Sequence, residues 1–284
     1  MIDIKKHSLY KTLEFDSSLS SIFTIYLKKF WPLFIFSFLG IFIIQMIMYQ
    51  LGFFELYSIS DPNEILRVFS TLMNKIVILS VTSVVVYGVL NTFLINYLLK
   101  SDFEPQVNFG DLLIESIKKY ALHMIFFLIL SMLMVLVGMF LGVIVFVVGL
   151  FAAVLYLGTV LITGGTIIVA EEKNAIDTVG RAFLLTHKDF WNALGIFVVF
   201  ILIIMLASLI VSAIVAIPFV IMFFDNLSET GNILEAFNFH SYDLGIWLVV
   251  TNSIVAAIVY PLYSILSVVL YFKLKFVEDQ KGLN

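Results

Sequence analysis

Apolar residues run along this chain in long stretches that are broken only by short polar passages. No Asp, Glu, Lys or Arg occurs in 120–170, 192–224 or 244–272. An uninterrupted apolar stretch of about 18 residues or more is typical of a helix that crosses a membrane. The pattern therefore predicts an all-α membrane protein with six transmembrane helices, at about 30–51, 76–98, 121–139, 143–169, 192–222 and 245–272.

The third and fourth spans belong to one uncharged stretch, 121–169. A continuous helix of this length would measure about 73 Å, whereas the hydrocarbon core of a bilayer is about 30 Å thick. The chain must therefore fold back, and we predict the turn at Gly138–Gly142, because glycine adopts turn conformations easily. The alternative is that these two glycines, four residues apart, let two helices pack closely together.

Three polar passages, 15–31, 109–121 and 175–191, precede the first, third and fifth spans. Each places apolar residues at helical spacing on one face and then ends in basic and aromatic residues, which is typical of an amphipathic helix at a membrane surface. The predicted face of the third passage consists of Ile176, Val179, Ala182 and Phe183. The alternative for this passage is a catalytic loop. The predicted interfacial anchors are Lys28, Lys29, Trp31, Lys118, Lys119, Tyr120, Lys188 and Trp191.

The three passages divide the chain into three similar units, at about 15–100, 109–172 and 175–276. Each unit is an interfacial helix followed by a transmembrane hairpin. We therefore expect a single membrane domain, 1–284, in which three hairpins of the same orientation form a pseudo-threefold bundle.

The distribution of basic residues predicts the orientation of the chain. Of the 16 Lys and Arg residues, all but Arg67 and Lys75 fall on the side of the N-terminus, which leaves fourteen on that side. Cytoplasmic segments of membrane proteins carry the excess of Lys and Arg. With an even number of spans, this bias predicts that both the N-terminus and the C-terminus are cytoplasmic.

Composition excludes several kinds of chemistry. The chain is 62% hydrophobic and only 13% charged, and it has no cysteine, so disulfides and thiolate catalysis are excluded. The four histidines are far apart in the sequence, and no HExxH motif occurs. Glu171 and Glu172 could form a carboxylate pair, although a solvated helix end is the simpler interpretation. We therefore predict no catalytic residue, no metal site, no cofactor and no nucleic-acid partner.

Polar groups and prolines within the spans are the remaining candidates for a functional site. No span carries an ionisable residue in its middle, where ion or proton coupling normally places one. Asn91 and Asn252 are the most prominent polar residues there, and each could instead make an ordinary hydrogen bond between helices. Pro218 and Pro261 would kink the fifth and sixth spans, and such kinks could open a cavity between them.

Four short segments within or just before the third unit carry a resemblance to a known family. Glu172-Lys173-Asn174, Ala182–Thr186 and Lys188-Asp189-Phe190-Trp191, together with the closing Val269–Lys275, resemble motifs of a bacterial membrane-domain family. That domain is fused to some glycerophosphodiester phosphodiesterases and also occurs alone in uncharacterised inner-membrane proteins. Lys188-Asp189 and Phe272-Lys273 depart from the usual Gly-x and Tyr-Asp of the family. The resemblance implies a stand-alone membrane domain in a bacterial inner membrane, without the phosphodiesterase activity.

Three functions remain open at this stage. The first is a non-enzymatic scaffold or accessory subunit of a membrane complex, with membrane lipids and a membrane protein as partners. The second is a carrier or channel for a lipid-like or apolar substrate, which a cavity between the fifth and sixth spans near Asn252 would favour. The third, an intramembrane enzyme, ranks last because no nucleophile, base and acid occur together.

Overall fold

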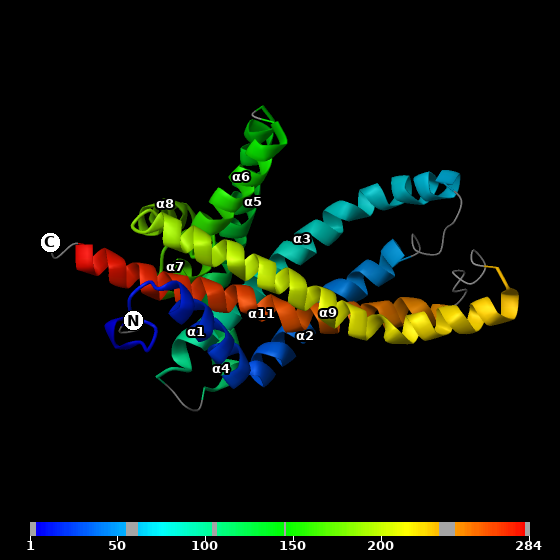
Figure 1. Cartoon of the computed structure of the whole chain (residues 1–284), viewed down its shortest axis with the longest axis horizontal. Coiled ribbons are helices and arrows are strands. Elements are labelled where there is room, and N and C mark those ends of the chain that lie inside the picture. Colours follow the sequence, from blue (N-terminus) through cyan, green and yellow to red (C-terminus); the bar gives the residue numbers. More distant parts are fainter. Residues whose placement is uncertain (1–3, 55–61, 104–106, 145, 233–241, 282–284) are drawn as a thin grey trace. The chain divides into compact units, whose positions relative to one another are not determined.

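The computed structural model describes residues 4–54, 62–103, 107–144, 146–232 and 242–281, and within these ranges all the regular structure is helical (Figure 1). The first half contains η1 (Ile4–Lys6), α1 (Phe15–Lys28), α2 (Phe30–Gln50), α3 (Pro62–Lys100), α4 (Phe109–Glu115) and the π-helical turn η3 (Ser116–Ala121). The second half contains α5 (Leu122–Ile144), α6 (Phe146–Leu161), α7 (Gly164–Glu171), α8 (Ala175–Thr186), α9 (Phe190–Thr230) and α11 (Tyr242–Lys281).

Six helical stretches of the described residues are long and apolar enough to cross a membrane, which confirms the predicted fold class. They are Phe30–Gln50, Lys75–Lys100, Phe109–Val143, Val148–Glu171, Phe190–Glu229 and Gly245–Lys281. They form three hairpins, and the short helices α1, α4 and α8 precede these hairpins in the chain. The protein is therefore a multi-pass integral membrane protein.

The chain divides into two compact units. Unit 1 comprises Met1–Phe36, Tyr87–Ile203 and Tyr260–Asn284, and unit 2 comprises Ser37–Val86 and Ile204–Val259. Helices α2, α3, α9 and α11 contribute residues to both units. The predicted division into three sequential units cuts the chain at other places and stays a prediction.

The core of unit 1 is built on α7 and on the second half of α11. Every residue of Gly164–Ala170 is buried, and so are Ile265–Leu274. The two glycines at the start of α7 permit this packing, because a Cβ atom on Gly164 would lie 2.0 Å from the Phe127 ring and one on Gly165 would lie 2.7 Å from Ile95. The side chains of Phe127 and Ile95 therefore pack directly against the α7 backbone. A residue larger than glycine at either position of α7 would prevent this contact.

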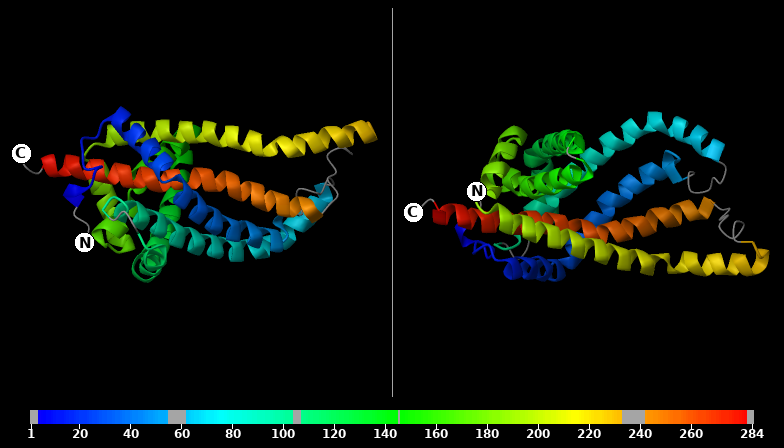
Figure 2. Two further views of the ribbon diagram at one scale, coloured as in Figure 1. Left: turned by 90° about the horizontal axis from the view of Figure 1, so that it is seen from below. Right: turned by 45° about the horizontal axis from the view of Figure 1, so that its top comes forward.

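The predicted turn between the third and fourth spans is wrong in position. Helix α5 continues through Gly138 and Gly142 to Ile144, and α6 begins at Phe146 (Figures 1 and 2). Both glycines instead face α6: a Cβ on Gly138 would meet Leu157 at 2.7 Å, and one on Gly142 would meet the carbonyl oxygen of Gly149 at 2.6 Å. The close-packing alternative is therefore correct, and the two backbones almost touch at Gly142.

Helix α8 shows why the predicted single apolar face needs correction. Asn174 caps its start by accepting a hydrogen bond from the Asp177 amide at 2.9 Å. Ile176 is 77% exposed, whereas Ala182, which we predicted to share its face, is buried against the protein. The buried side of the helix consists of Ala175, Thr178, Ala182, Leu185 and Thr186.

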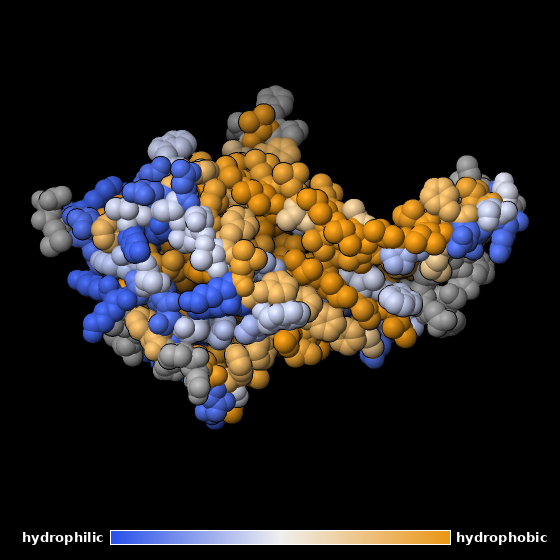
Figure 3. All heavy atoms as spheres, turned by 60° about the horizontal axis from the view of Figure 1, so that its bottom comes forward, coloured by the Kyte–Doolittle hydropathy of each residue, from blue (hydrophilic) through white to orange (hydrophobic). Residues whose placement is uncertain are grey.

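The other two short helices also use two faces. Ile22 of α1 is buried while Leu27 is exposed, and Leu112 of α4 is buried while Ile117 in the following turn is exposed. Each helix thus packs one side on unit 1 and leaves apolar side chains on another side, where lipid can cover them. In Figure 3 hydrophilic residues gather where α1 and the end of α11 lie, and hydrophobic residues cover the helix surfaces beside them.

Unit 2 contains the remaining parts of α2, α3, α9 and α11. The start of α11 packs closely on the end of α2, because a Cβ on Gly245 would lie 2.4 Å from the Tyr49 ring. The Lys75 ammonium donates a 2.8 Å hydrogen bond to the carbonyl oxygen of Leu51, which fixes α3 to the end of α2. Unit 2 also contains a groove, which is described next.

Candidate functional site

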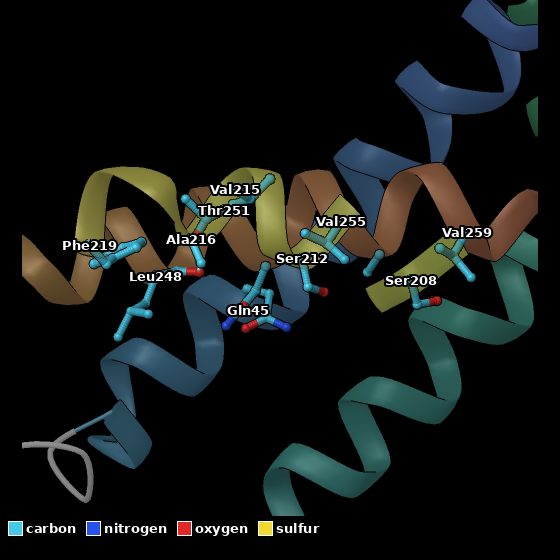
Figure 4. A pocket seen from close by; sticks show the side chains of 12 residues that line it. Gln45, Ser208, Ser212, Val215, Ala216, Phe219, Leu248, Thr251, Val255 and Val259 are labelled. Carbon is cyan, nitrogen blue, oxygen red and sulfur yellow. Dashed lines mark hydrogen bonds between the residues drawn. The ribbon is translucent and has the colours of Figure 1, made fainter. Parts of the chain in front are cut away.

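A groove of about 490 Å³ opens in unit 2 between α2, α9 and α11 (Figure 4). Five of its lining residues lie on α9 between Ser208 and Phe219, and six lie on α11 between Leu248 and Val259. Their spacing of three or four residues places them on one stripe of each helix. Gln45 of α2 completes the lining.

Small side chains on both facing helices create this space. Ala216 on α9 and Ala256 on α11 line the groove together with Ser208 and Ser212. None of these four side chains is large enough to fill the gap between two helices. A ligand pocket typically has a volume of about 300–1,000 Å³, so the groove has a suitable size for one.

Gln45 is the unusual polar group of the groove. Its Oε1 atom is buried and has no hydrogen-bond partner within the part of the chain that the structure describes. Thr251 behaves differently, because its hydroxyl donates to the carbonyl oxygen of Trp247 in its own helix at 2.8 Å. A buried amide oxygen without a partner is a rare feature that calls for a ligand or a water molecule.

The structure places the four predicted intramembrane positions in different surroundings. Asn252 lines the groove of unit 2, where the carrier hypothesis places a cavity between the fifth and sixth spans. Asn91 lies in unit 1 and accepts a 3.2 Å hydrogen bond from the Ser264 hydroxyl, which is the ordinary bond between helices. Pro218 and Pro261 lie inside α9 and α11, and both helices continue through them.

A cluster of ion pairs in unit 1 is the second notable site. Arg181 of α8 donates two 2.6 Å hydrogen bonds to the two carboxylate oxygens of Glu278, and its Nε atom lies 3.0 Å from Glu171. Tyr271 donates a further hydrogen bond to Glu171 at 3.1 Å. The hydrogen bonds to Glu278, supported by Glu171, raise the pKa of Arg181, so the guanidinium stays charged.

The cluster was not predicted from the sequence, and it contradicts the prediction made for Glu171. Glu171 is not a solvated helix end, because it is held between Arg181 and Tyr271. Glu172 does fit that description: it is exposed, ends α7 with φ of 55°, and pairs with the Lys119 ammonium at 2.5 Å. The residues of the cluster come from α7, α8 and α11, and sequence separations of up to 100 residues concealed their association.

The segment before α1 folds onto the end of α11. Tyr10 donates a 2.7 Å hydrogen bond to Asp279, and the Lys273 ammonium donates to the carbonyl oxygen of Thr12 at 3.1 Å. His7 stacks on Phe272 with ring centroids 3.9 Å apart. Burial lowers the pKa of His7 to about 4 against a weaker upward effect of Asp102, so His7 is neutral in the folded protein.

The predicted interfacial anchors occupy several kinds of environment. Trp31 and Trp191 are 67% and 79% exposed, as side chains that meet lipid headgroups should be. Lys28, Lys118 and Lys188 are also exposed. Lys29 donates a 2.5 Å hydrogen bond to Ser101, and Lys119 pairs with Glu172. Tyr120 is only 5% exposed and packs inside unit 1, so its side chain does not reach the membrane surface.

The residues that the structure describes contain no candidate metal site. No three His, Asp or Glu side chains converge there as a metal ion would require. Comparison with protein-family models gives no match, and comparisons with curated proteins and with solved structures give none either. Fold and composition therefore define a class, a multi-pass integral membrane protein, and the family resemblance stays a prediction.

Proposed function

We propose that this membrane protein binds an amphiphilic, lipid-like molecule in the groove of unit 2 and acts as a carrier for it. The single observation behind this proposal is the groove itself, a space of about 490 Å³ beside Asn252 that is lined by residues of α2, α9 and α11. Helix contacts that serve stability alone are closely packed. A gap of this size with a polar patch on an apolar wall suits a lipid-like molecule.

Filling the groove tests this proposal. Ala216→Phe places an aromatic ring in the groove, and Ala213→Phe makes the same change on an exposed side of α9 that does not line it. For both variants in lipid nanodiscs, crosslinking to a diacyl lipid with a photoreactive acyl chain would be measured. We expect A216F to reduce crosslinking at α9 and α11 by about fivefold or more, because the ring occupies the binding space, and A213F to leave it unchanged.

Equal crosslinking in wild type and A216F would contradict the proposed function, provided that A216F elutes as a single species and melts near the wild-type temperature. A change in both phenylalanine variants would point to a general effect on α9 rather than to the groove. Only a loss confined to A216F supports the carrier.

A scaffold or accessory subunit is the second candidate function. The span Phe109–Val143 has the smallest buried share of the six, and Phe126, Met132 and Phe140 on it are all exposed. These side chains could meet a partner membrane protein as well as lipid. Gentle extraction that recovers one stoichiometric partner would support this role.

The orientation of the protein in the membrane is also a proposal, with both ends cytoplasmic. The hydrogen bond between Tyr10 and Asp279 supports one part of it, because it holds the N-terminal segment against the C-terminal end of α11, so that both chain ends lie on the same side. Reporter tags inserted after Gly52 and Gly231, two glycines with positive φ at helix ends, are expected to be accessible only from the outer side. Accessibility from the same compartment as the two chain ends would contradict the six-span topology.

A further inference from the structure

We infer that the groove of unit 2 takes an uncharged amphiphile whose polar group carries a hydroxyl, and that this hydroxyl donates a hydrogen bond to Gln45. The inference rests on the proposed function, since it names the chemical class of the molecule that the groove carries. A diacylglycerol is the simplest molecule of this class.

The lining of the groove indicates that its occupant is uncharged. All twelve residues that line it are apolar or neutral, and Gln45, Ser208, Ser212, Thr251 and Asn252 are its polar members. A phosphate or carboxylate placed there would lose hydration without meeting an Arg or Lys side chain. The groove therefore favours a neutral polar group over the charged headgroup of a phospholipid.

Gln45 indicates which neutral group fits. Its amide oxygen accepts hydrogen bonds, is buried, and has no donor within the described residues. An ester carbonyl is itself an acceptor and cannot satisfy this atom, whereas a hydroxyl can. Figure 4 shows the side chains of Gln45 and Ser212 among those that line the groove.

The shape of the groove suits the remainder of such a molecule. On α11 the lining extends from Leu248 to Val259, which is about 16 Å of helix. Val215, Phe219, Val255 and Val259 supply apolar surface along it. An acyl chain can therefore lie along α9 and α11 while its hydroxyl is held at Gln45.

The test uses three related probes and the protein in lipid nanodiscs. They are radiolabelled dioctanoylglycerol, its acetylated form, which lacks the hydroxyl, and its phosphorylated form, which is charged. We expect dioctanoylglycerol to bind about tenfold more tightly than either derivative, as one hydrogen bond to a buried acceptor allows. Q45L should remove the preference for dioctanoylglycerol over the acetylated form. Gln50→Leu makes the same change at an exposed position of α2 and should keep that preference.

Each of the other outcomes contradicts one specific part of the inference or of the proposed function. Equal binding of the acetylated form, or an unchanged preference in Q45L, means that water or nothing satisfies Gln45 and overturns the inference. Equal binding of the phosphorylated form overturns the uncharged class. In both cases the carrier proposal survives if A216F still abolishes binding. If no probe binds wild type more tightly than A216F, the proposed function itself fails.

Discussion

Replacing Arg181 with methionine is expected to destabilise the protein by about 2–4 kcal/mol. The guanidinium holds Glu171 and Glu278 together, and its side chain is only 16% exposed. Methionine has a similar length but no charge, so Glu171 would lose its cationic partner and Glu278 would keep only the Lys275 ammonium, 2.7 Å away. Helix α8 would lose its ion pair with α11. The fall in melting temperature of the purified protein in detergent measures the effect.

Lys188→Met is the matched control, because Lys188 belongs to the same region but its side chain is exposed. Its removal should change stability by less than about 0.5 kcal/mol. Arg181→Lys should fall between the two, since lysine keeps the charge but cannot form the paired hydrogen bonds to Glu278. A melting temperature of R181M equal to that of K188M would show that the cluster contributes nothing to stability.

The second large effect is expected at the crossing of α5 and α6. Gly142→Ala should destabilise the protein by about 1–3 kcal/mol, because the added methyl group would lie 2.6 Å from the backbone carbonyl oxygen of Gly149. Backbone atoms cannot rotate aside as a flexible side chain can, so the two helices would have to separate. Thermal unfolding in detergent again provides the measurement.

Gly180→Ala supplies a contrast of the opposite sign. No atom lies within 4 Å of a Cβ built on Gly180 in α8, so alanine should stabilise this helix by about 0.5–1 kcal/mol through its higher helix propensity. A loss of stability in both variants, or in neither, would show that the contact at Gly142 is not the cause.

The membrane class and the six spans could be predicted because they depend on one local property. The uncharged runs, such as 192–224, are long enough to cross a bilayer and contain no Asp, Glu, Lys or Arg. Charged residues mark the span boundaries except the one between the third and fourth spans, which lies within the uncharged stretch 121–169, and the predicted and observed helices agree within a few residues at most of the other ends. Local composition was sufficient here, and no knowledge of tertiary contacts was needed.

The errors arose where one sequence pattern fits two structures. Glycines four residues apart, at Gly138 and Gly142, suit a turn and a close helix crossing equally well. In α8, Ile176 meets the surroundings and Ala182 meets the protein, although both are apolar. Hydrophobicity alone cannot separate a lipid-facing side chain from a protein-facing one, because both environments exclude water.

The ion-pair cluster and the groove depended on long-range contacts. Arg181 and Glu278 are 97 residues apart, and the sequence gives each many other possible partners. For the groove, Asn252 could be singled out as a polar residue within a span, but Gln45 could be noted only as one polar group among several. Its importance comes from an unsatisfied atom, which only a three-dimensional arrangement reveals.

The wide turn at Ser116–Ala121 carries a consequence for the evolution of the third span. A π-helical turn holds one residue more than an ordinary α-helical turn, so it advances the rest of the helix by about 100°. Met124 and Phe127, which follow this turn in the chain, lie against the glycines of α7. Deletion of one residue within 116–121 would therefore rotate every side chain of α5 about the helix axis, although the sequence of α5 would stay the same.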